Sequence, residues 1–194
     1  MHVLKPIFVS IAALVTLATC SGQEISAEIR RLDVPTLRTM IDQSLLSLNA
    51  QIPDAVLAQV SVDPSTGTVI IRIVNRDSTI GADIVAPSPD TPLGEWQVLI
   101  GKYTPLSGSP HIGIKMEDVR IGPTDVIRAT FNQWPQCKPR SINLVENDGQ
   151  AQWWFVFCDS KEGILSGRMN AATGEFFPSG NPPALAPPTA KPES

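Results

Sequence analysis

Two segments of this 194-residue chain place apolar residues at helical spacing, and each is followed by short runs of β-forming residues. The first helical face consists of Val34, Leu37, Ile41, Leu45 and Leu48. The second consists of Val126, Ile127, Phe131 and Trp134. A helix with one apolar face must bury that face against another element. The sequence therefore predicts an α+β domain over residues 33–177, with two amphipathic helices packed on antiparallel β-structure.

The β-forming runs and the turns between them give the rest of the expected layout. The runs lie at 56–62, 68–74, 94–101, 111–121, 141–146, 151–158 and 163–169. The Asn147-Asp148-Gly149 sequence between two of these runs predicts a hairpin. Residues 77–93 are rich in Pro and Asp and are expected to form a long loop. The Pro-rich segment 178–194 lacks core-forming residues, which predicts a disordered or extended tail.

The N-terminus carries the pattern of an export signal. Lys5 precedes an apolar run from Ile7 to Ala18 that contains no charge. This run is shorter than the roughly 20 apolar residues that a transmembrane helix needs, but it has the length of a signal-peptide core. We therefore expect residues 1–19 to be a signal peptide and the protein to work outside the cytoplasm. The alternative is a buried N-terminal helix.

The end of this segment resembles a known processing site. Leu17-Ala18-Thr19-Cys20 resembles the lipobox of bacterial lipoproteins, although Thr19 stands where that family usually has Gly, Ala or Ser. The resemblance implies that Cys20 is acylated and becomes the first mature residue. Ser21 then implies retention at the outer membrane, with residues 20–32 as a tether. The alternative is ordinary signal-peptidase cleavage near Cys20 to Gly22.

The remaining cysteines, Cys137 and Cys158, are expected to form a disulfide. They flank the strands on either side of the predicted hairpin, in a chain expected in an oxidising compartment. Two buried free thiols are the alternative. A metal site is not expected, because the pair lacks the CxxC spacing and His111 is the single histidine after residue 19.

Charge argues against a nucleic-acid partner. The whole chain has 15 basic and 19 acidic residues. Removing Lys5 with the signal leaves 14 basic residues, so the mature side-chain charge is −5 (14 − 19). Binding to phosphates requires a basic footprint, and Arg30-Arg31 is the largest basic cluster.

One turn motif occurs twice, in residues 63–69 and 170–176, as Asp/Asn-x-x-Thr-Gly-x-apolar. Ordinary β-turn chemistry explains such a motif, and two related helix-plus-hairpin units are the alternative. The order of elements over residues 123–177, closed by the second copy of the motif, resembles a PepSY-type unit. This resemblance implies a helix on a small antiparallel sheet and a role as an envelope interaction domain, in which the motif residues form turns.

Signatures of common enzyme chemistry are missing from the sequence. There is no Gly-x-Ser-x-Gly, His-Glu-x-x-His, P-loop or dinucleotide fingerprint. The neighbouring acids Glu117-Asp118, and Asp159 with Glu162, are better explained as surface charges than as catalytic pairs. No cofactor is expected.

The aromatic strand 151–158 is the candidate contact surface. Alternation sends Trp153, Phe155 and Phe157 to one face and Trp154 to the other. One face is expected to pack on the second helix, and the other is either buried by the first half of the chain or open to a partner. Trp153, Phe155 and Phe157 are the candidate partner surface.

Together these features predict a non-catalytic, lipid-anchored protein of the periplasm or outer membrane that binds another envelope protein. A secreted hydrolase built on carboxylates, or a carrier of an apolar ligand, are the alternatives.

The lipobox resemblance predicts the mass of the mature protein. We expect intact-mass spectrometry of the protein from its native host to show a chain starting at Cys20 that carries a diacyl or triacyl group. An unmodified chain starting near Ser21 or Gln23 would contradict this prediction.

The cysteine count predicts a second mass difference. Reduction of the same sample is expected to add the mass of two protons, because Cys137 and Cys158 form one disulfide. An unchanged mass on reduction would show that both thiols are free.

Overall fold

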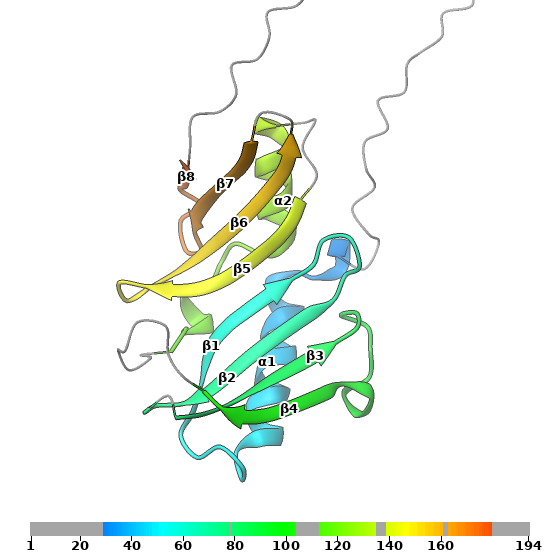
Figure 1. Cartoon of the computed structure of the whole chain (residues 1–194), viewed down its shortest axis with the longest axis vertical. Coiled ribbons are helices and arrows are strands. Elements are labelled where there is room, and N and C mark those ends of the chain that lie inside the picture. The colour runs from blue at the N-terminus through cyan, green and yellow to red at the C-terminus, as the bar shows by residue number, and fades with distance from the viewer. Residues whose placement is uncertain (1–28, 78, 104–112, 135–138, 161–162, 180–194) are drawn as a thin grey trace, which may run out of the picture.

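The computed structural model describes residues 29–77, 79–103, 113–134, 139–160 and 163–179, with the side chains of 157–160, 163–165 and 179 left aside. These residues form an α+β fold with one eight-stranded antiparallel sheet (Figure 1). The helical elements are a short 3-10 turn η1 (Ile29–Arg31), α1 (Val34–Leu48), η2 (Leu93–Glu95), η3 (Met116–Asp118) and α2 (Pro123–Gln133). The strands are β1 (Ala55–Val62), β2 (Val69–Asn75), β3 (Ile80–Ala86), β4 (Gln97–Lys102), β5 (Pro139–Asn147), β6 (Gln150–Ser160), β7 (Gly163–Asn170) and β8 (Phe176–Ser179).

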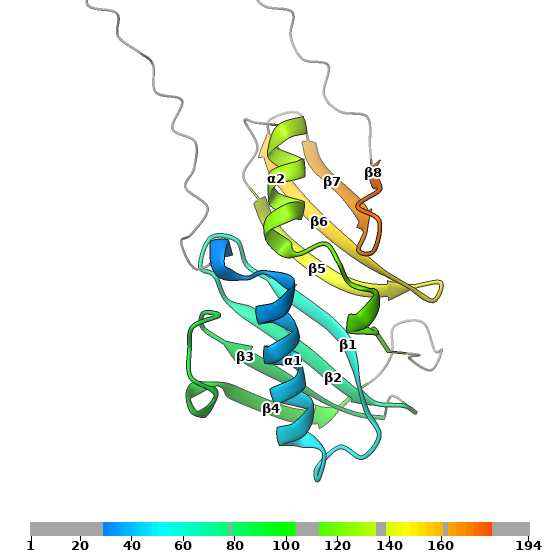
Figure 2. The same ribbon diagram turned by 180° about the vertical axis from the view of Figure 1, so that it is seen from behind.

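The chain runs through the same order of elements twice. The first unit is α1 followed by β1 to β4, and the second is α2 followed by β5 to β8. Strands β1 and β5 pair antiparallel, so the sheet order is β4-β3-β2-β1-β5-β6-β7-β8. Both helices lie on the same side of this sheet, as Figures 1 and 2 show from its two sides. The other side, called here the outer face, carries no helix (Figure 1).

Helix α1 begins where the sequence predicts it. The Asp33 carboxylate accepts a hydrogen bond from the Thr36 N–H (2.8 Å), and Pro35 lies in the first turn. Hydrogen bonding by Thr36 also holds the pKa of the Asp33 carboxyl below its usual value. The N-cap thus satisfies a backbone donor that the first helical turn leaves without a partner.

One hydrophobic core joins the two units. Its members come from both helices and from strands on either side of the β1–β5 junction. Two hydrogen bonds fix the start of the second unit: Trp153 Nε1 donates to the Ile121 carbonyl just before α2 (2.7 Å), and Thr124 Oγ1 in the first turn of α2 donates to the Ile29 carbonyl of η1 (2.9 Å). The second unit is therefore fastened to the first by buried side chains as well as by the sheet.

The repeated turn motif has the same geometry in both places. Gly67 N–H donates to the Asp63 carbonyl and Gly174 N–H to the Asn170 carbonyl, each at 2.9 Å, and both glycines have positive φ. The first copy, however, joins β1 to β2, whereas the second joins β7 to β8. The copies are not equivalent positions of the two units, so the motif is explained by β-turn chemistry.

The segment expected as a loop, 77–93, contains strand β3. Gly81 and Ala82 give this strand little apolar bulk, and Asp83 interrupts it in the sequence. On the outer face, however, the Asp83 carboxylate accepts two hydrogen bonds from Arg72 of β2 (2.7 and 2.8 Å). This ion pair allows a charged residue to lie within the strand. The sequence of β3 alone could not predict the pair, because Arg72 lies on another strand.

The prediction of a strand over 111–121 was wrong for its described part. Residues 113–115 have no regular secondary structure, with Gly113 at positive φ, and η3 follows. Ile114 and Met116 are buried at a spacing of two, which mimics a strand. One backbone hydrogen bond, from the Ile114 N–H to the Leu57 carbonyl of β1 (2.8 Å), joins this segment to the sheet, and the chain then turns into η3 at Met116 instead of continuing a ladder.

Both ends of the folded region extend beyond the predicted limits. Ile29 and Leu32 are fully buried, so the tether predicted for 20–32 cannot include them. At the other end, Pro178 and Ser179 belong to β8 rather than to the predicted tail. The signal peptide, the rest of the tether and residues 180–194 lie outside the described residues. Within the described ranges, neither α1 nor α2 has the length and hydropathy to cross a bilayer.

The contact between Gly167 and Phe155 gives a test of the core. A Cβ added at Gly167 would lie 2.8 Å from Phe155 Cζ, whereas one added at Gly101 of β4 would meet nothing within 4 Å. We expect Gly167→Ala to lower the free energy of unfolding by about 1–3 kcal/mol through overpacking, and Gly101→Ala to leave it nearly unchanged. Urea denaturation checks both variants, and equal midpoints would contradict this account of the core.

Candidate functional site: a groove on the outer face

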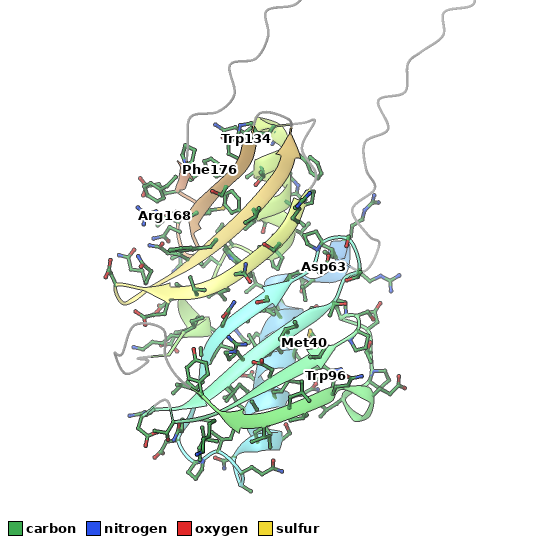
Figure 3. All side chains as sticks on the ribbon, in the orientation of Figure 1. Met40, Asp63, Trp96, Trp134, Arg168 and Phe176 are labelled. Carbon is green, nitrogen blue, oxygen red and sulfur yellow. The ribbon has the colours of Figure 1, made fainter. Side chains whose placement is uncertain are left out.

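A groove of about 690 Å³ opens on the outer face of the second unit. Strands β5 to β8 all contribute to it. Its lining residues are Asn143, Trp154, Phe155, Val156, Ser166, Gly167, Arg168, Phe176, Phe177 and Pro178. Figure 3 labels Arg168 on β7 and Phe176 on the neighbouring strand β8.

Sheet register aligns the central side chains of this groove. Asn143 lies opposite Trp154, Trp154 opposite Arg168, and Arg168 opposite Phe177. Directly opposite residues in an antiparallel sheet point to the same face and are close enough to interact. An amide, an indole, a guanidinium and a phenyl ring therefore form a row across four strands, called here the cross-strand row.

Trp154 is the exposed one among the aromatic side chains of strand β6 that the structure describes. Its side chain is 46% exposed, whereas Trp153 is 0% and Phe155 2% exposed. The alternation predicted from the sequence is confirmed, but the helix covers the face of Trp153 and Phe155. The proposed partner surface was wrong for these two residues, because they lie in the core. The Phe157 side chain lies outside the described residues.

Arg168 gives the groove a positive charge. Its guanidinium lies over the Phe177 ring, 5.2 Å from the ring centroid, in a cation–π contact. Among the described residues no carboxylate lines the groove. In an acidic protein, this combination presents an aromatic surface beside a cation that an anionic group can approach.

Beneath the groove the inner side of the sheet is filled by stacked aromatic rings. The Phe155 and Phe176 rings stack with their centroids 5.4 Å apart, and Trp134 packs against Phe176 at 5.6 Å. Trp134 and Trp96 are both buried. Packed rings give the cross-strand row a rigid base.

A smaller hydrogen-bonded group lies on the outer face of the first unit. Arg72 binds Asp83 and lies 5.7 Å from the centroid of the Tyr103 ring. Hydrogen bonds to Asp83 raise the pKa of Arg72, against the opposing effect of burial. Arg72 thus has a carboxylate partner, whereas Arg168 packs on the Phe177 ring and forms no ion pair with a described residue.

A second crevice, of about 470 Å³, lies between α1 and the segment that leads to α2. Asp42 and Glu117 both line it, together with Arg38, whose guanidinium donates to the Met116 carbonyl (2.8 Å). This crevice therefore holds two carboxyl side chains, the residue type that a carboxylate-based hydrolase needs.

Several predicted site residues cannot be placed. Cys20, Cys137 and His111 lie outside the described residues, and Cys158 lies on β6 with its side chain undescribed. The disulfide and the lipidation therefore stay predictions. The described part of the chain contains no cluster of three or more His, Cys, Asp or Glu side chains that could hold a metal ion.

Comparison with known proteins gives one informative similarity. No family model and no curated protein matches the chain, so the PepSY resemblance stays a prediction. Among solved structures, the fold is similar to that of a "putative lipoprotein" from Clostridium difficile 630, with a TM-score of 0.51 and 8% sequence identity. The match covers 71% of this chain and 89% of that one. At this identity the similarity shows a shared fold.

Proposed function

We propose that this protein is an exported, lipid-anchored and non-catalytic module that binds another envelope protein through the groove on its outer face. The cross-strand row is the observation that carries the proposal. Trp154 leaves nearly half of its large apolar side chain in water on an otherwise well-packed unit. Exposed aromatic residues beside an arginine are typical of the centres of protein interfaces.

The shape of the groove favours an extended segment of the partner. The row crosses four strands, from Asn143 on β5 to Phe177 on β8. Trp154 and Phe177 offer apolar faces, Arg168 attracts a carboxylate, and Asn143 can both donate and accept hydrogen bonds. We therefore expect the partner to supply an apolar or proline residue next to an acidic one.

The lipid anchor in this proposal is supported by the lipobox-like sequence that ends at Cys20. The similar C. difficile structure is itself described as a "putative lipoprotein", which is consistent with a fold used at the envelope. Two acyl chains or more hold a protein stably at a membrane surface without a spanning helix.

The groove favours binding over the two alternatives. A hydrolase built on carboxylates needs two acids in its cleft, whereas this groove has Arg168 as its charged residue. A carrier of an apolar ligand needs an enclosed cavity, whereas here the aromatic rings under the sheet pack against each other. A filled core below an open aromatic surface supports a binding role.

Photocrosslinking followed by affinity measurement tests the proposal. A photoreactive amino acid at Ser166, which lines the groove, is expected to capture a specific partner in the native host, and the same amino acid at the exposed Leu46 of α1 is not. The purified partner is then titrated by calorimetry. We expect Trp154→Ala to weaken binding by about 30-fold, which corresponds to roughly 2 kcal/mol at a central aromatic contact.

Two further variants separate charge from packing. Arg168→Glu is expected to weaken binding more than Arg168→Gln, because the partner carries an acidic group, and the difference should shrink at high salt. Leu46→Ala is the matched control at an apolar residue away from the groove. Equal affinity of wild type and Trp154→Ala, or identical crosslinks from Ser166 and Leu46, would overturn the proposal.

A further inference from the structure

Strand β4 ends the sheet on the first unit with an apolar sequence that faces solvent. All six of its residues are exposed, and Leu99 is 64% exposed. Val98 and Ile100 on the helix side, and Leu99 on the outer face, form a continuous apolar strand at the edge (Figure 1, green). This edge belongs to the unit that does not contain the groove.

The strand lacks the features that normally keep an edge from pairing. It contains no proline, its register with β3 has no bulge, and its only charged residue is Lys102 at the end. The opposite edge strand, β8, is four residues long and contains Pro178. Natural proteins protect free edges with prolines, charges, bulges or short strands, so an unprotected apolar edge marks a pairing surface.

The backbone of β4 presents hydrogen-bonding groups to the open side. Tyr103 N–H donates to the Thr79 carbonyl (3.0 Å), and these residues lie opposite each other at the end of the β3–β4 ladder. Because backbone groups alternate in direction along an antiparallel strand, those of Val98, Ile100 and Lys102 point away from β3. No described residue outside β4 bonds to these backbone groups, so another strand can pair with them.

We propose that two copies of this protein associate through antiparallel pairing of their β4 strands around a two-fold axis at Leu99. In this register Val98 of one copy lies opposite Ile100 of the other, and their outward backbone groups bond to each other. On the outer face, Leu99 of one copy lies opposite Leu99 of the other. Each apolar side chain of the strand thus meets an apolar partner, and the two sheets become one.

Charge supports a second copy as the occupant. Glu95 lies just before β4 and Lys102 ends it, and both are exposed. In the proposed register Lys102 of each copy lies opposite Trp96 of the other, one residue along the chain from Glu95. A surface that is complementary to itself in charge and in apolar pattern fits an isologous dimer.

Charge reversal at the two-fold axis tests this proposal. We expect sedimentation of the detergent-solubilised mature protein to show a concentration-dependent dimer. Leu99→Lys and Leu99→Glu should each weaken dimerisation by about tenfold or more, because like charges then lie opposite each other. A mixture of the two variants should restore the dimer. Leu46→Lys makes the same change at a residue that is 78% exposed on α1 and should dimerise as wild type does.

The outcomes are unambiguous, because Leu99 is exposed and its replacement should leave the fold intact; circular dichroism checks this. A wild-type protein that stays monomeric at every concentration would overturn the proposal. So would a Leu99→Lys variant that dimerises as tightly as wild type, or a mixture of variants that stays monomeric. Trp154→Ala should leave dimerisation unchanged, which separates this inference from the proposed function of the groove.

Discussion

The structure depends on the antiparallel pairing of β1 with β5, because this short ladder turns two four-stranded units into one sheet. Only Gln59 to Val62 and Ile142 to Val145 take part in it. Its register sends Val60, Val62, Ile142 and Leu144 to the same side, where all four are fully or almost fully buried. Both helices therefore cover one shared core, and no helix covers the outer face of the sheet.

Much of this fold could be predicted from local sequence patterns. The two helices, the Asn-Asp-Gly hairpin and the positive-φ glycines of the repeated turn follow from spacing and from turn chemistry that act over a few residues. Strand β3 could not be predicted in this way, because Asp83 fits a strand only through Arg72 on the neighbouring strand. Likewise, the buried spacing of Ile114 and Met116 resembled a strand, although the chain turns into η3 at Met116 after one backbone hydrogen bond to β1.

The candidate site could be predicted only in part, because it also depends on contacts between residues that are far apart in the sequence. Alternation along residues 151–158 correctly separated Trp154 from Trp153 and Phe155, but it could not say which set the helix covers. That choice depends on contacts such as the hydrogen bond from Trp153 to Ile121, which joins residues far apart in the sequence. The roles of Arg168 and Phe177 depend on the register of β6, β7 and β8, which no local pattern specifies.

The division into two units also separates the two surfaces energetically. The cross-strand row lies wholly on β5 to β8, and the apolar edge lies on β4, with β3, β2 and β1 between them. Substitutions at such distant sites share no neighbouring side chain, and their effects on free energy normally add. A chain built in this way can change what one half recognises while the other half keeps its own contacts, so the two properties are free to evolve independently.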